Sequence, residues 1–163
     1  MSGIIIVGAG QAAGQAAASL RQEGYEGSIT LFGEEPQAPY QRPPLSKAYL
    51  SGELAMERVL VRPEKFYTDK SIELHTGTRI ETVNPDNKTV TANDGQTHSY
   101  DKLLLATGSR PRILNIEGSD LAGIHYLRTI DDVDGIRASM ATAEHICIVG
   151  GDYIGLEVAA VAN

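Results

Sequence analysis

The stretch that decides the fold is "GIIIVGAGQAAG", residues 3–14. A β-branched run enters a glycine-rich turn that small residues follow, so the stretch predicts a strand, a tight turn and a helix. Gly8, Gly10 and Ala13 match the pattern G-x-G-x-x-A. In that pattern the first residue makes the turn, the second lets the backbone approach a pyrophosphate, and the third lets the helix pack close to the strand. The start of the chain therefore predicts the first half of a nucleotide-binding βαβ unit.

The next strand completes that unit. Gly24 and Gly27 end the helix, and "SITLFGEE", residues 28–35, predicts a second strand with acidic residues at its carboxyl end. Glu34 lies 26 positions after Gly8, where a carboxylate can accept hydrogen bonds from both hydroxyls of a ribose. The helix N-terminus would present unpaired N–H groups to the phosphates. These residues predict a bound ADP moiety, and by themselves they leave NAD and FAD both open.

A related stretch lies near the other end of the chain. "ICIVGGDYIGLEVAA", residues 146–160, predicts a strand at 146–149, a glycine turn and a helix. Asp152 stands where G-x-G-x-x-G has its middle glycine. Its Cβ crowds a phosphate and its charge opposes one by about 1–4 kcal/mol at contact distance, so weakened dinucleotide binding is one prediction. The other is that Asp152 caps the helix, which keeps the turn but loses the ligand.

The segment between these units changes pattern several times. Its proline-rich start predicts an ordered loop, and Asn-Asp-Gly predicts a tight hairpin turn within a small antiparallel meander. The predicted elements are a loop at 36–44, helices at 45–53 and 62–70, strands at 72–77, 79–84, 88–93 and 97–100, a buried strand from Leu103 to Ala106, and a helix from near Thr129 or Asp131.

This order of elements predicts an α/β fold. We expect a Rossmann-like three-layer domain, made of a parallel sheet, helices and a small antiparallel β-meander, followed by the start of a second Rossmann-like unit. The predicted domains are 1–112 and a truncated 113–163.

The composition limits the function classes. The chain has 163 residues, 42% of them hydrophobic, which is enough for one domain with a core and part of another. Its 14 Lys and Arg against 21 Asp and Glu give a net charge of −7, which argues against nonspecific binding to nucleic acid or anionic lipid. No apolar run approaches the roughly 18–20 residues that span a bilayer, and the start lacks a signal peptide's basic region. The four histidines are scattered, so no metal site is predicted.

Cys147 is the only cysteine. It cannot form an intramolecular disulfide, which favours a reducing compartment, and we expect a cytoplasmic protein. Its apolar neighbours predict that Cys147 is a small buried strand residue.

Three stretches carry a resemblance to a known family. They are "APYQRPPLSKAYLSGE" (38–53), "LLLATGSRPR" (103–112) and "GGDYIGLEVAA" (150–160). In this order they resemble the FAD-dependent ferredoxin and rubredoxin reductases of the glutathione-reductase-like pyridine nucleotide flavoprotein superfamily. The resemblance covers nearly the whole chain and implies the N-terminal portion of an enzyme that is more than twice as long. It also implies FAD as cofactor, NADH as electron donor, and a ferredoxin or rubredoxin type iron–sulfur protein as acceptor, serving an oxygenase or P450.

The resemblance also implies roles for individual residues. Lys47 and Glu157 would be catalytic, close to the flavin and the entering nicotinamide, and would pair with each other across the domain junction. An ammonium near the ring favours flavin reduction. The implied FAD contacts are Gly8, Gly10, Ala12, Ala13, Glu34, Arg42, Lys47, Ile80, Thr107, Gly108 and Arg128, and the implied nicotinamide contacts are Gly150, Gly151, Tyr153, Ile154 and Gly155.

Alternatives remain at this stage. "YQRPPLSK" contains no cysteine where disulfide reductases of the superfamily carry theirs, so electrons would leave to an external acceptor. An oxidase like apoptosis-inducing factor, the flavin subunit of a nitrite reductase, and a noncatalytic dinucleotide-binding module stay open. The sequence does not decide between NADH and NADPH, nor the oligomeric state.

Overall fold

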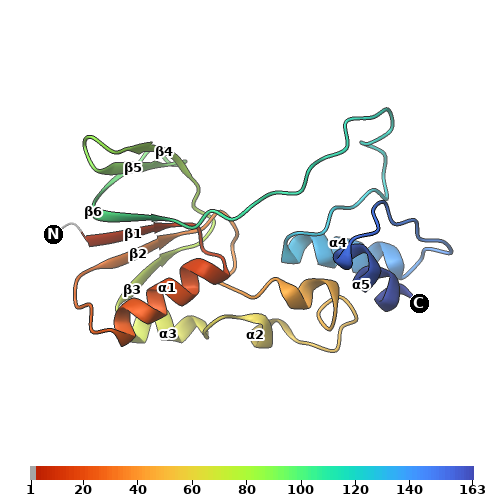
Figure 1. The fold of residues 1–163 in the computed structure, drawn as a ribbon, viewed down its shortest axis with the longest axis horizontal. Coiled ribbons are helices and arrows are strands. Elements are labelled where there is room, and N and C mark those ends of the chain that lie inside the picture. Colours follow the sequence, from red (N-terminus) through yellow and green to blue (C-terminus); the bar gives the residue numbers. More distant parts are fainter. Residues whose placement is uncertain (1–2) are drawn as a thin grey trace. The chain divides into compact units, whose positions relative to one another are not determined.

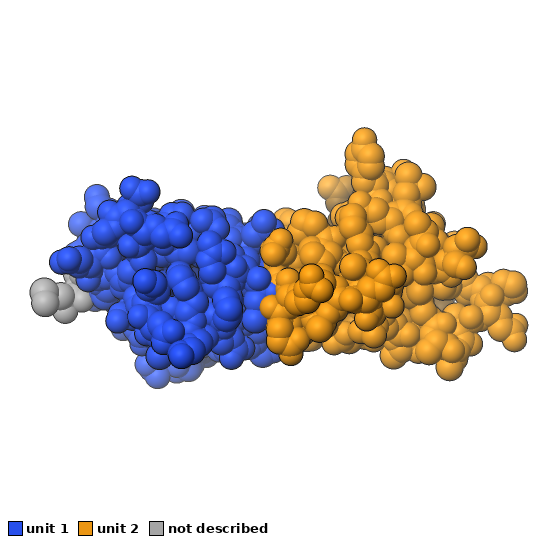
Figure 2. Space-filling model, turned by 90° about the horizontal axis from the view of Figure 1, so that it is seen from below, with its two compact units in different colours: residues 1–40, 60–108 blue, residues 41–59, 109–163 orange. Residues whose placement is uncertain are grey.

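The computed structural model describes residues 3–163, and the chain divides into two compact units. Unit 1 consists of Met1–Tyr40 and Leu60–Gly108, and unit 2 consists of Gln41–Val59 and Ser109–Asn163 (Figure 2). Met1 and Ser2, at the start of the predicted first domain, lie outside the described residues. The domain boundary after residue 112 remains a prediction, since compact units and functional domains need not coincide.

Unit 1 is built on a six-stranded sheet in the order β3-β2-β1-β6-β5-β4 (Figure 1). Neighbouring strands are parallel from β3 to β6 and antiparallel from β6 to β4. The strands are β1 (Gly3–Val7), β2 (Ile29–Phe32), β3 (Ile72–His75), β4 (Ile80–Asn84), β5 (Thr89–Ala92) and β6 (Thr97–Leu105).

Strand β6 differs from the prediction of two separate strands at 97–100 and 103–106. It is one continuous strand of nine residues, which pairs with β5 at Thr97–Ser99 and then with β1 up to Leu105. The predicted burial of this region is wrong, because Leu104 is 39% exposed and Leu105 is 60% exposed. Along residues 101–105, no second strand among the described residues pairs with the other edge of β6.

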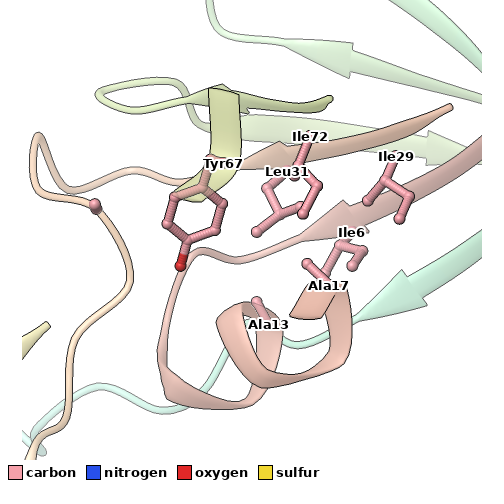
Figure 3. Packing of buried hydrophobic residues seen from close by; sticks show 8 residues of the cluster. Ile6, Ala13, Ala17, Ile29, Leu31, Tyr67 and Ile72 are labelled. Atoms are coloured by element: carbon pink, nitrogen blue, oxygen red, sulfur yellow. The ribbon is translucent and has the colours of Figure 1, made fainter. Parts of the chain in front are cut away.

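Two helices cover one face of the sheet, α1 (Gln11–Gln22) and α3 (Glu64–Asp69). Because side chains alternate along a strand, Ile6 of β1 faces these helices and packs with Ala13 and Tyr67 (Figure 3). Its neighbour Ile5 faces the other way and packs with Val90 of the meander. Helices, parallel sheet and meander therefore form the three predicted layers, and the predicted α/β fold class is confirmed.

Unit 2 contains a short 3-10 helix η1 (Pro43–Ser46) and three α-helices: α2 (Met56–Val59), α4 (Ile130–Met140) and α5 (Tyr153–Ala162). The predicted helix at 45–53 is wrong, because the backbone at Lys47 leaves helical geometry and turns follow up to Gly52, whose φ is +82°. Helix α2 was not predicted. Helix α4 begins after Thr129, as predicted, and Thr129 and Asp132 form a capping box.

The predicted strand at 146–149 does not form. A strand needs a partner for its backbone hydrogen bonds, and no described residue pairs with this segment. Cys147 is consequently exposed rather than buried. Within residues 3–163, no helix is long and apolar enough to cross a bilayer, and no group of three or more His, Cys, Asp or Glu side chains is placed to hold a metal ion.

Candidate functional site

The turn after β1 brings two predicted site segments together. Gly8 has a φ of +110°, and a Cβ there would lie 2.2 Å from the carbonyl oxygen of Ala106. Both the conformation and the close approach therefore require glycine at this position. Thr107 and Gly108 follow Ala106 directly, so the turn after β6 lies against the turn after β1.

Gly10 requires a different explanation. It is the N-cap of α1, with an extended backbone (φ −87°), and a Cβ there would meet nothing within 4 Å. Neither backbone conformation nor packing within the chain explains why this residue has no side chain. No side chain caps the helix at this residue, and Ala12 in the first turn is exposed. The N-terminal N–H groups of α1 thus border open space, which fits a pyrophosphate.

Sequence reasoning missed Gly14, one turn further along α1. A Cβ at this residue would lie 2.7 Å from Pro39 Cβ and 3.1 Å from the hydroxyl oxygen of Tyr67. The loop that precedes unit 2 and helix α3 therefore both pack on α1 through this glycine. The only sequence signal was the run of small residues after the fingerprint.

Glu34 lies just beyond the end of β2, as predicted. Its Oε1 is 3.6 Å from Nη1 of Arg79, and both side chains are about half exposed, at 53% and 52%. An ion pair this exposed contributes little to stability. Because Arg79 precedes Ile80 at the start of β4, the predicted ribose contact and the predicted adenine contact lie at the same end of the sheet.

In unit 2, Arg42 and Arg128 are joined by a hydrogen bond from Arg42 Nη1 to the backbone carbonyl of Arg128. The backbone N–H groups of Arg128 and Thr129 donate to Oδ2 of Asp132, at 2.9 and 2.7 Å. The capping box of α4 thus fixes the backbone at Arg128. The Nε atom of Arg128 is buried and has no partner among the described residues. A buried N–H without an acceptor is costly, so this atom fits a contact with a bound polar or anionic group.

Lys47 and Glu157 form the predicted ion pair, with Nζ 2.6 Å from Oε2. Both residues belong to unit 2. The Ser46 hydroxyl donates to the same oxygen at 2.5 Å. The hydrogen bond from Lys47, followed by that from Ser46, lowers the pKa of Glu157 below its ordinary value. Sequence reasoning missed Ser46, because a serine in a polar loop gives no signal of a distant partner.

The second fingerprint reproduces the backbone of the first. Gly150 has a φ of +112°, close to that of Gly8, and the N-cap Asp152 is extended (φ −77°) like Gly10. The difference lies in the cap itself. Asp152 Oδ1 accepts a hydrogen bond from the backbone N–H of Gly155 at 3.0 Å. Asp152 therefore caps α5, as one of the two predictions stated, whereas the predicted weakening of dinucleotide binding stays a prediction.

The remaining residues of this fingerprint border open space or solvent. Tyr153 is 86% exposed and Ile154 is 50% exposed, so neither is a core residue in this unit. A Cβ at Gly151 would meet nothing within 4 Å. At Gly155 it would lie 2.7 Å from the carbonyl oxygen of Gly150, so a small residue is required there.

Known proteins resemble this chain over almost its whole length. A family model described as pyridine nucleotide-disulphide oxidoreductase matches residues 2–163. A ferredoxin–NAD(P)(+) reductase of Sphingomonas sp is 44% identical over 158 residues, which cover 97% of this chain and 38% of that protein. A rubredoxin–NAD(+) reductase of Pseudomonas putida is 45% identical over 159 residues, covering 98% of this chain and 41% of that protein.

Solved structures give the same result. The crystal structure of a ferredoxin reductase from Rhodopseudomonas palustris matches with a TM-score of 0.94 at 40% identity, over 99% of this chain and 40% of that chain. The reductase in a covalent complex of putidaredoxin reductase with putidaredoxin matches with a TM-score of 0.89 at 40% identity, over 99% of this chain and 39% of that chain. The resemblance inferred from the sequence is confirmed, and the chain spans about two-fifths of the length of these relatives.

Proposed function

The chain belongs to the pyridine nucleotide-disulphide oxidoreductase family, and we propose that it is the N-terminal portion of an FAD-dependent reductase. This reductase takes electrons from NADH and passes them to a small iron–sulfur protein of the ferredoxin or rubredoxin type, which serves an oxygenase or P450. The names of the relatives support the donor and the acceptor. The observation that carries the proposal is Gly10, whose missing side chain leaves the N-terminus of α1 open.

In unit 1, the residues around the first fingerprint hold the ADP half of FAD. The N-terminus of α1 binds the pyrophosphate, and Glu34 accepts hydrogen bonds from the ribose hydroxyls. Their proposed companions are Gly8, Ala12, Ala13, Ile80, Thr107 and Gly108.

In unit 2, Arg42 and Arg128 provide cationic contacts to the cofactor, and the buried Nε of Arg128 supports this role. When bound, FAD supplies the chemistry that accepts a hydride from a nicotinamide and releases electrons to an acceptor. The Lys47 ammonium stabilises negative charge that develops nearby. Because its pKa is lowered, Glu157 stays ionised at neutral pH beside Lys47.

The proposed nicotinamide site is formed by the second fingerprint, with Gly150, Gly151, Tyr153, Ile154 and Gly155. Asp152 weakens this site, because its carboxylate already takes a backbone N–H that a phosphate would use. The proposal includes a cytoplasmic location, which suits the exposed thiol of Cys147.

The first test asks whether the chain binds FAD through α1. After incubation with FAD and removal of the unbound cofactor by gel filtration, we expect the chain to remain yellow, with flavin absorption bands that travel with the protein. Gly10→Asp places on α1 the carboxylate that Asp152 places on α5, and we expect it to weaken FAD binding by at least about tenfold because the cap and the charge both oppose a phosphate. Gly10→Ala adds only a Cβ and separates crowding from charge. A colourless protein, or equal affinity in Gly10→Asp, contradicts the proposal and favours a noncatalytic module.

The second test concerns Asp152 and measures, by fluorescence titration, the affinity for NADH of an otherwise full-length reductase that contains this chain. We expect Asp152→Gly to bind NADH at least about tenfold more tightly, since it removes both the competing cap and the charge. Asp152→Asn keeps the volume and a capping oxygen but removes the charge, so it should recover only part of the gain. No gain in Asp152→Gly would show that Asp152 does not limit NADH binding.

A further inference from the structure

Ser46 is unusual among the residues described. It is 4% exposed, and apart from tyrosines it is the one buried polar side chain in residues 3–163. It ends η1, and its hydroxyl donates to Oε2 of Glu157 on α5, 111 positions away in the sequence. A buried hydroxyl that spans so long a sequence separation holds two otherwise unrelated segments in a fixed geometry.

Lys47, the next residue, contacts the same oxygen. Its Nζ lies 2.6 Å from Oε2 of Glu157 and also donates to the backbone carbonyl of Pro43 at 3.2 Å. The Lys47 side chain is 50% exposed and that of Glu157 is 31% exposed. Partly exposed ion pairs are often loose, because two long side chains must be held in one geometry. The short, buried Ser46 side chain has little freedom to lose, so it can fix the carboxylate where Lys47 meets it.

We propose that Ser46 is a positioning residue that holds the Glu157 carboxylate on Lys47, so that the two charges act as one nearly neutral pair. The inference deepens the proposed function, which places Lys47 and Glu157 beside the flavin and the nicotinamide. There, the charge that an incoming ligand meets depends on how firmly Glu157 is held. An unanchored Glu157 would leave Lys47 as a more positive centre, which favours flavin reduction.

The test needs no cofactor. NMR titration of the Glu157 side-chain carboxyl in the 163-residue chain measures its pKa directly. We expect Ser46→Ala to raise the midpoint towards the ordinary value of a glutamate, because a hydrogen bond to the charged form of an acid lowers its pKa. Ser46→Thr keeps a hydroxyl and should restore the midpoint. Ser51→Ala is the matched control, since its hydroxyl, in the same segment, donates to the carbonyl of Ala48 and not to Glu157.

A double-mutant cycle with Lys47→Met separates positioning from simple hydrogen bonding. If Ser46 holds Glu157 on Lys47, removing Lys47 first makes the effect of Ser46→Ala clearly smaller. Additive shifts would overturn positioning, and so would an unmoved midpoint in Ser46→Ala or an equal shift in Ser51→Ala. Failure of the proposed function would instead appear as a lack of flavin binding with the Glu157 titration unchanged.

Discussion

At the residue scale, Tyr67 shows how a fully enclosed polar group behaves in this fold. Its side chain projects from α3 towards α1 and is 2% exposed, and its hydroxyl has no hydrogen-bond partner among the described residues (Figure 3). Burial raises the pKa of Tyr67 to about 12 from the ordinary value of 10.0, with Arg62 opposing the shift. The ring stabilises the fold by apolar packing, while its buried, unpaired hydroxyl lowers the stability.

The raised pKa of Tyr67 predicts a pH-dependent loss of stability. Between its two pKa values the phenol stays protonated in the folded protein but ionises in the unfolded chain. Its contribution to the free energy of unfolding is therefore complete below pH 10 and is lost as the pH rises towards 12. A shift of about two units corresponds to about 3 kcal/mol. Urea unfolding measures the free energy of unfolding at each pH. Between pH 9 and 12 we expect this free energy to fall by up to about 3 kcal/mol more in the native chain than in Tyr67→Phe. At pH 7 the variant should be more stable by about 1 kcal/mol, because an unpaired buried hydroxyl is removed. Parallel pH curves for the two proteins would contradict this account.

At the element scale, Arg21 fastens the end of α1 to the turn between α3 and β3. Its guanidinium donates to the backbone carbonyls of Tyr25 and Gly27 after the helix, and to those of Lys70 and Ser71 before β3. Ser71 has a φ of +51°, which is unfavourable for a residue with a side chain. Arg21 therefore helps to hold a strained turn at the start of β3.

Replacing this side chain should destabilise unit 1. We expect Arg21→Met to lower the free energy of unfolding by about 1–3 kcal/mol, since four carbonyl contacts are lost but most of those carbonyls can still reach water. Arg21→Lys should fall in between, because an ammonium cannot reproduce the planar fork of a guanidinium. Arg58→Met is the control, as Arg58 is exposed, and it should change the value by less than about 0.5 kcal/mol. Equal effects of Arg21→Met and Arg58→Met in urea titrations would refute the role of Arg21.

The elements that could be predicted are those specified by local chemistry. The β-branched run before Gly8 fixed β1, and Thr129 with Asp132 fixed the start of α4. Errors arose where the outcome depends on distant partners. The apolar segments at 103–106 and 146–149 contain residues typical of buried strands, but burial requires neighbouring strands, which the described residues do not supply.

In the candidate site, too, features set by local chemistry could be predicted and those that depend on distant partners could not. The pairing of Lys47 with Glu157 was predicted by family resemblance, whereas Ser46 was not, because only the folded chain shows that residues 111 positions apart meet. For Asp152 the sequence left two outcomes open, and local geometry showed the cap.

At the scale of the whole molecule, the outer edge of β6 is unpaired within the described chain along residues 101–105, and Leu104 and Leu105 on it are exposed. Residues 101–105 have β1 on one side and no described strand on the other. An apolar hollow beside them is lined by Ile4, Leu20, Leu103 and Leu104. Unpaired strand edges with exposed apolar side chains are templates for pairing with another chain.

We therefore expect the isolated chain to self-associate as its concentration rises, measured by sedimentation velocity. Leu105→Lys should shift the molecules towards monomer, because a charge on the edge strand opposes pairing. Ile116→Lys is the matched control: Ile116 is 63% exposed and lies outside the sheet, and its replacement should have little effect. Purely monomeric behaviour, or an equal effect of both variants, would exclude the edge as the site of association.

The continuity of β6 also limits how the length of this protein can vary. One uninterrupted strand serves the meander through Thr97–Ser99 and the parallel sheet up to Leu105, and it leads directly to Thr107 and Gly108. Side chains alternate between the two faces of the sheet along a strand. Inserting or deleting one residue inside β6 would therefore move the side chains on one side of the change to the opposite face, and would displace the turn that packs on Gly8. Insertions and deletions among related proteins should therefore fall in the hairpin turns at 85–88 and 93–96, and hardly ever between residues 97 and 105.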